Sequence, residues 1–144
     1  MTKKYELLIG DCLRAGDRTV YRIRALRDFG DVRCGDLGGY VENESALAHD
    51  GDAWVQDVAQ VYGPNGRVGG NARVKGEAWV LGRVEGDAEI CDLVVVEERA
   101  YVGGRTVLCG NEIVRGDPLR AVERRRAGGE SLCVHLGRSF TIRL

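Results

Sequence analysis

A six-residue phrase repeated through the middle of the chain constrains the fold more than any other feature. The phrase reads x-small-x-aliphatic-x-Gly, as in NARVKG at 71–76 and EAWVLG at 77–82. It extends from about Val41 to Gly116, with slips at 49–51, 64–66 and 81–83, and each slip contains Gly. A period of six is typical of a hexapeptide β-helix, whereas the 3.6-residue period of an amphipathic α-helix is absent.

Two columns of residues are expected to face the interior of such a β-helix. Three phrases close one coil of about 18 residues, and coils stack about 4.8 Å apart. The narrow interior accounts for the low aromatic content of 6%. The aliphatic column comprises Val41, Leu47, Val55, Val61, Val68, Val74, Val80, Val84, Ile90, Val96, Val102, Leu108 and Val114, and the small column comprises Ala53, Ala59, Ala72, Ala78, Ala88, Val94, Ala100 and Thr106.

The segments on either side of the repeat are expected to cap its open ends, because an exposed stack of strands invites aggregation. Residues 1–40 form the N-terminal cap, in which the runs 5–9 and 19–26 pair as a β-hairpin. Pro118 ends the repeat. In the C-terminal cap, residues 117–144, we predict a short helix over 119–127 and strands over 131–136 and 139–144. The 144 residues suit one domain.

Residues between the two columns should point outward and stack on three faces. One face reads Trp54, Arg73, Glu89 and Val107, and we expect Arg73 to lie over Trp54 and beside Glu89. A third face reads Arg67, Arg83 and Tyr101. The second face reads Gln60, Trp79, Val95 and Ile113, which is unusually apolar for exposed positions. Such a strip is normally covered, by the C-terminal segment or by another subunit. We favour self-association through Trp79, Val95 and Ile113, giving a homo-oligomer.

Charge and cysteine content limit the possible classes of function and the cellular location. The net charge of −1 argues against a nucleic-acid binder held by bulk positive charge. The five cysteines are odd in number and show no C-x-x-C spacing, and no apolar stretch is long enough for a membrane span. We therefore expect reduced thiols in a cytoplasmic protein. Cys91 and Cys109 lie 18 residues apart and could form a disulfide, but we interpret them as two thiols in a turn ladder.

Three segments carry a resemblance to a known family. Residues 21–29, 35–42 and 51–55 resemble the YdcK-like proteins of phages, prophages and enterobacteria, and the repeat resembles the left-handed β-helix of the bacterial transferase hexapeptide family. The resemblance covers roughly residues 19–116 and is specific for the fold. It implies an all-β, left-handed parallel β-helix of about four coils, commonly a trimer. It says little about activity.

Few residues suit enzyme chemistry. An acetyltransferase of this fold typically uses a histidine as general base in a cleft between subunits. His49 lies in an inserted corner beside Asp50 and Asp52 and is the weak catalytic candidate, although a histidine in a polar turn is more often a surface residue. A β-helix carbonic anhydrase needs three zinc-ligating histidines, and this chain has two. We expect no metal site and no cofactor.

The densest positive charge lies near the C-terminus, and we take Arg120, Arg124, Arg125 and Arg126 as the candidate binding residues. A solvated helix face is the ordinary interpretation, and binding of phosphate or of an acidic surface is the functional one. The sequence favours a non-catalytic phage- or prophage-type accessory protein that binds a host protein or an anionic ligand, for instance a host defence or regulatory factor that it inhibits. The alternatives are an acyl-CoA-dependent acyltransferase and a structural module of a phage assembly.

Overall fold

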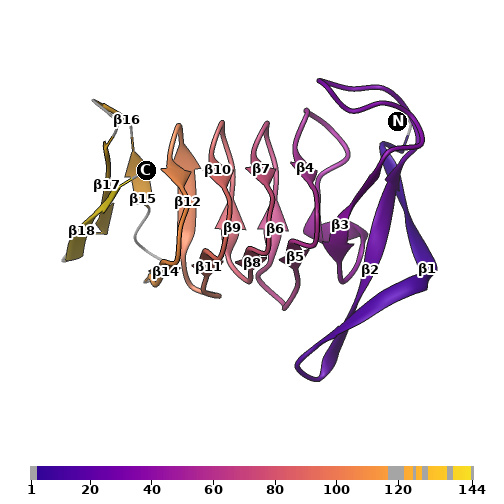
Figure 1. The fold of residues 1–144 in the computed structure, drawn as a ribbon, viewed down its shortest axis with the longest axis horizontal. Coiled ribbons are helices and arrows are strands. Elements are labelled where there is room, and N and C mark those ends of the chain that lie inside the picture. The colour runs from indigo at the N-terminus through magenta and orange to yellow at the C-terminus, as the bar shows by residue number, and fades with distance from the viewer. Residues whose placement is uncertain (1–2, 117–121, 125, 128–129, 136–137, 144) are drawn as a thin grey trace.

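The computed structural model describes residues 3–116 and, as backbone, strand residues 122–124, 126–127, 130–135 and 138–143. It is a left-handed parallel β-helix of about four coils, with antiparallel strands at both ends (Figure 1). The elements are β1 (Tyr5–Ala15), β2 (Arg18–Ala25), β3 (Leu37–Val41), η1 (Glu44–Ala46), β4 (Trp54–Val55), β5 (Gln60–Val61), β6 (Arg67–Val68), β7 (Arg73–Val74), β8 (Trp79–Val80), β9 (Arg83–Val84), β10 (Glu89–Ile90), β11 (Val95–Val96), β12 (Tyr101–Gly104), β13 (Val107–Leu108), β14 (Ile113–Val114), β15 (Val122–Arg124), β16 (Arg126–Ala127), β17 (Glu130–His135) and β18 (Arg138–Arg143).

Three parallel ladders form the walls of the β-helix. The first runs β3-β5-β8-β11-β14, the second β4-β7-β10-β13, and the third β6-β9-β12-β15. Every residue of the two predicted interior columns is buried, which confirms the hexapeptide register. The three walls enclose a narrow interior, so only small side chains fit there. Equivalent residues of successive coils stack on one another to form the core. At the insertion over 49–51 the chain passes close to the next coil: Gly51 has φ +71°, and a Cβ there would meet the Gly70 carbonyl oxygen at 2.4 Å.

The N-terminal hairpin covers one end of the stack, as predicted. Strands β1 and β2 pair antiparallel, β2 pairs with β3, and β3 begins the first parallel ladder (Figure 1). The segment between β2 and β3 brings the Phe29 ring edge-on to Trp54, with ring centroids 5.2 Å apart. Trp54, expected on an outer face, is therefore buried.

The outward residues stack as predicted, but Arg73 has different partners. Its register with Trp54 and Glu89 is confirmed. However, the guanidinium donates to Asp31 of the N-terminal segment and to Gln56 Oε1 at 3.1 Å. Because this segment covers Trp54, the arginine turns toward the carboxylate above it.

The predicted helix over 119–127 is wrong. The chain forms β15, which pairs in parallel with β12 and places Val122 opposite Val102, and then the short strand β16. The open edge of β12 offers unpaired backbone groups, and this pairing outweighs the helix propensity of an Arg- and Ala-rich segment. The two C-terminal strands are confirmed as β17 and β18, which pair antiparallel with each other.

The expectation of reduced thiols is wrong for one cysteine pair. Cys91 and Cys109 form a disulfide, with Cα atoms 4.7 Å apart. Their 18-residue separation is one coil, so the parallel register stacks one directly over the other. Cys12 and Cys34 are free and exposed.

Candidate functional site

A groove of about 640 Å³ lies along the third ladder, and three arginines are among its lining residues. Arg67 of β6, Arg83 of β9 and Tyr101 of β12 stand in parallel register on its floor. The corner preceding β12 contributes Glu98 and Arg99, and the corner preceding β6 contributes Pro64 and Asn65. This volume lies within the range of small-molecule sites, roughly 300–1,000 Å³.

The charges in the groove are only partly balanced. Arg83 pairs with Glu85, and the Tyr101 hydroxyl donates to the other carboxylate oxygen at 2.8 Å. Burial alone would raise the pKa of Glu85, but the hydrogen bonds from Arg83 and Tyr101 outweigh it and hold the pKa below its ordinary value. Glu85 is thus an anion at neutral pH, and its charge is committed to Arg83.

Within the described part of the chain, the other two arginines of the groove, Arg67 and Arg99, have no carboxylate partner. Arg67 donates to the backbone oxygen of Gly66 at 3.0 Å. Among residues 3–116, no carboxylate forms an ion pair with Arg67 or Arg99, and both side chains are exposed. Among the described residues, the three arginines of the groove face two carboxylates, Glu85 and Glu98. The groove therefore has an excess of positive charge, which favours a ligand carrying phosphate or carboxylate groups.

A second depression of about 210 Å³ adjoins the groove and shares Arg67 and Arg83 with it. Glu44, Ser45 and His49 line its far side. The weak catalytic candidate His49 therefore lies near the arginine groove, a proximity that the repeat period does not predict.

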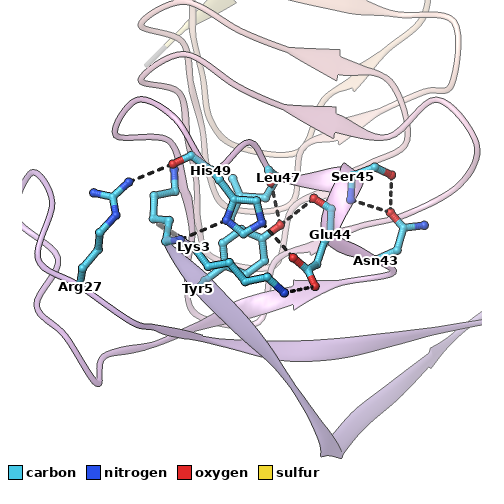
Figure 2. A network of polar contacts seen from close by, with 9 residues as sticks. Lys3, Tyr5, Arg27, Asn43, Glu44, Ser45, Leu47 and His49 are labelled. Atoms are coloured by element: carbon cyan, nitrogen blue, oxygen red, sulfur yellow. Dashed lines mark hydrogen bonds and ion pairs between the residues drawn. The ribbon is translucent and has the colours of Figure 1, made fainter. Parts of the chain in front are cut away.

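Both ring nitrogens of His49 are used inside the protein. The Lys4 backbone N–H donates to Nδ1 at 3.1 Å, which leaves the proton on Nε2, where it faces Glu44 Oε1 at 3.0 Å (Figure 2). The ring stacks on Tyr5 with centroids 4.4 Å apart. With Nδ1 accepting a backbone N–H, the imidazole has no free lone pair for a substrate proton, so the geometry makes His49 a clamp for β1.

Burial sets the ionisation of two residues beside this clamp. Tyr5 is fully buried and donates to the Leu47 oxygen at 2.7 Å; burial, followed by the nearby Glu44 charge, raises its pKa. Lys4 is also fully buried, and its Nζ donates to the Ala53 oxygen at 2.7 Å. Burial, followed by the positive charge of Arg27, lowers the pKa of Lys4 to about 8.

The apolar face, defined as Trp79, Val95 and Ile113, lies in register on the first ladder as predicted. Trp79 is 46% exposed and Ile113 is 49% exposed. Leu93, in the turn before β11, is also exposed.

The structure describes only part of the predicted C-terminal arginine cluster. Arg120 and Arg125 lie outside the described residues, and Arg124 and Arg126 are described only as backbone in β15 and β16. Arg67, Arg83 and Arg99 form the basic site that the structure does define. The outward ladder of Arg67 and Arg83 was visible in the repeat register, whereas Arg99 belongs to a corner whose direction the repeat does not specify.

Comparison with known proteins gives a significant similarity to a protein of Escherichia coli. No family model matches the chain. A protein of Escherichia coli (strain K12) named "Uncharacterized acetyltransferase YdcK" is 33% identical over 63 residues. The match covers 44% of this chain and 19% of the relative, so the chain spans about a fifth of that protein's length. The similarity fits the hexapeptide-repeat fold. In the part of the chain that the structure describes, no helix is long and apolar enough to cross a membrane.

Proposed function

We propose that this protein is a non-catalytic binding module that holds an anionic group of its partner in the arginine groove. The observation that carries the proposal is the pair of exposed arginines, Arg67 and Arg99, that line the groove and form no ion pair with a carboxylate of residues 3–116. A stack of hydrogen-bonded rungs gives these side chains a rigid base, which limits the entropy lost on binding.

The test is a titration of the protein with inorganic pyrophosphate, followed by the amide NMR signals of residues 98–101. We expect saturable shifts that weaken with salt, and at least about tenfold weaker binding in Arg67→Gln/Arg99→Gln, since each charge-assisted hydrogen bond contributes about 1.5–3 kcal/mol. Arg105→Gln is the matched control, because Arg105 is exposed and lies outside the groove lining. Equal binding by the double variant and the control would refute the assignment.

The biological setting is part of the same proposal. On the resemblance of residues 19–116 to the YdcK-like proteins of phages, prophages and enterobacteria, the partner is a host macromolecule with an acidic surface, such as a defence or regulatory factor. Capture of one host protein by the wild type, lost in Arg67→Gln/Arg99→Gln and kept in Arg105→Gln, is the expected result. A role as a structural module of a phage assembly predicts instead that the protein copurifies with virions in a fixed ratio.

An acyltransferase is the second candidate function. The relative named as an acetyltransferase favours it, as does the position of His49 in a depression that shares two arginines with the groove. The use of Nδ1 as an acceptor for the Lys4 N–H weighs against it. Release of free thiol from acetyl-CoA in the presence of amine or hydroxyl acceptors, abolished by His49→Gln, would replace the binding proposal with the enzymatic one.

A further inference from the structure

Two cysteines and a carboxylate meet at the corner of the coil that follows β10 and β13, and none of the three lines the arginine groove. Cys91 follows β10 and Cys109 follows β13, one rung apart, and Asp92 comes next to Cys91. Their two sulfurs and a carboxylate oxygen of Asp92 all lie within 4.8 Å of one another. Both cysteines are half-buried and Asp92 is exposed, so the group is open to solvent on one side.

The backbone holds the Asp92 carboxylate in a fixed orientation. Asp92 adopts the left-handed conformation, φ +57°, which is unusual for a residue other than glycine. Its Oδ2 accepts the Gly110 N–H at 3.0 Å. This bond occupies one carboxylate oxygen and leaves Oδ1 available, an arrangement common for metal-binding carboxylates, which are themselves oriented by hydrogen bonds.

The turn at Asp57, earlier in the β-helix, has the same conformation but no cysteines. Asp57 has φ +60°, and its Oδ2 accepts the Gly76 N–H at 3.0 Å. There the positions that correspond to the two cysteines are Gln56 and Lys75, and the Gln56 N–H donates to Val74 as the Cys91 N–H donates to Leu108. The aspartate therefore has a backbone role in both turns, and the thiol pair is what distinguishes the turn at Asp92.

We propose that, when the disulfide is reduced, the thiolates of Cys91 and Cys109 and the carboxylate of Asp92 bind Zn²⁺. Two sulfurs and one oxygen are ligands that Zn²⁺ accepts, and a solvent water completes the tetrahedron. The disulfide and the zinc complex exclude each other. A small-molecule disulfide RSSR interconverts them: the two protein thiolates lose two electrons and join as a disulfide, RSSR gains two electrons and leaves as two RS⁻, and Zn²⁺ is released.

The experiment uses the full chain with Cys12, Cys34 and Cys133 changed to serine, reduced with a phosphine. Co²⁺ is added first, because thiolate ligands give a charge-transfer absorption band, and Zn²⁺ affinity is then measured by competition with a chromophoric chelator. We expect one ion per chain, loss of the band in Cys109→Ser, and at least about tenfold weaker Zn²⁺ binding in Asp92→Asn. Addition of glutathione disulfide should release the metal.

Asp57→Asn is the matched control, because it alters the equivalent turn away from the thiols. Reduced wild-type protein is the reference for folding, since Cys109→Ser also lacks the disulfide. The proposal is overturned if reduced protein shows no thiolate band with Co²⁺, or if Cys109→Ser binds Zn²⁺ as tightly as the parent. It is also overturned if Asp92→Asn and Asp57→Asn have equal effects on Zn²⁺ affinity. None of these outcomes depends on the arginine groove.

Discussion

Lys4 should make the free energy of unfolding rise with pH between about 8 and 10. The residue is fully buried at the capped end of the β-helix, where its Nζ donates to the carbonyl oxygens of Ala53 and Gly51 and lies 4.9 Å from the Phe29 ring centroid. Burial, followed by the Arg27 charge, lowers its pKa to about 8, from an ordinary value of 10.5. The folded protein therefore releases this proton at a lower pH than the unfolded chain does.

The sign and the size follow from proton linkage. Between pH 8 and 10 the unfolded state binds more protons at this position than the folded state, so the stability increases with pH. With one pKa unit equivalent to about 1.4 kcal/mol, the gain from pH 7 to 10 is about 2–3 kcal/mol. Above pH 10 the raised pKa of Tyr5 acts in the opposite direction, because the unfolded tyrosine ionises first. The pH range over which stability rises therefore ends near pH 10.

The assay compares wild type with Lys4→Met by guanidinium denaturation, monitored by circular dichroism at pH 7, 8, 9 and 10. Methionine keeps the apolar stem but leaves the carbonyl oxygens of Ala53 and Gly51 without their donor, a cost independent of pH. The wild-type stability minus the Lys4→Met stability should rise by about 2–3 kcal/mol across the range. Titration of the free thiols cancels in this difference. A difference that is constant or falls with pH would refute the assignment of a buried, charged Lys4.

Three further predictions concern His49, the Cys91–Cys109 disulfide and the apolar face. His49→Ala removes the acceptor of the Lys4 N–H and the ring stacked on β1, so unfolding free energy should fall by about 1–3 kcal/mol and the Lys4 amide should exchange faster with deuterium. Reduction of Cys91–Cys109, which closes an 18-residue loop, should cost about 3 kcal/mol; equal denaturation midpoints with and without a phosphine reductant would contradict this. We also propose that the apolar face joins copies of the chain, so Trp79→Asp should lower the native mass in light scattering, and an unchanged mass would exclude this face as the interface.

The interior could be predicted from the sequence because its packing is periodic. Each buried valine of a ladder lies opposite its equivalent one coil away, so the six-residue phrase determines both its burial and its neighbours. The outward registers of Arg67 with Arg83 and of Trp79 with Val95 follow from the same period. The prediction failed where a non-repeating segment intervened: the N-terminal segment buries Trp54, which the period alone places on the outside.

The roles of single residues outside the period were not predictable in this way. His49 contacts the Lys4 backbone, 45 positions earlier, and no spacing rule links an inserted corner to a capping strand. The C-terminal segment shows the same limit. Its Arg- and Ala-rich composition favours a helix locally, but the free edge of β12 decides its conformation.

A β-helix assembles chemistry from residues that lie about one coil apart, and this explains why local motifs are absent from the sequence. Arg67, Arg83 and Arg99 each come from a different coil, yet they line one groove. Cys91 and Cys109 are separated by 18 residues, yet their Cα atoms are 4.7 Å apart. Searches for compact motifs read along the chain, whereas the sites of this fold are arranged along the helix axis. For such proteins the informative alignment places each coil under the next. Arginines or cysteines that occupy the same position in successive coils are then easy to recognise.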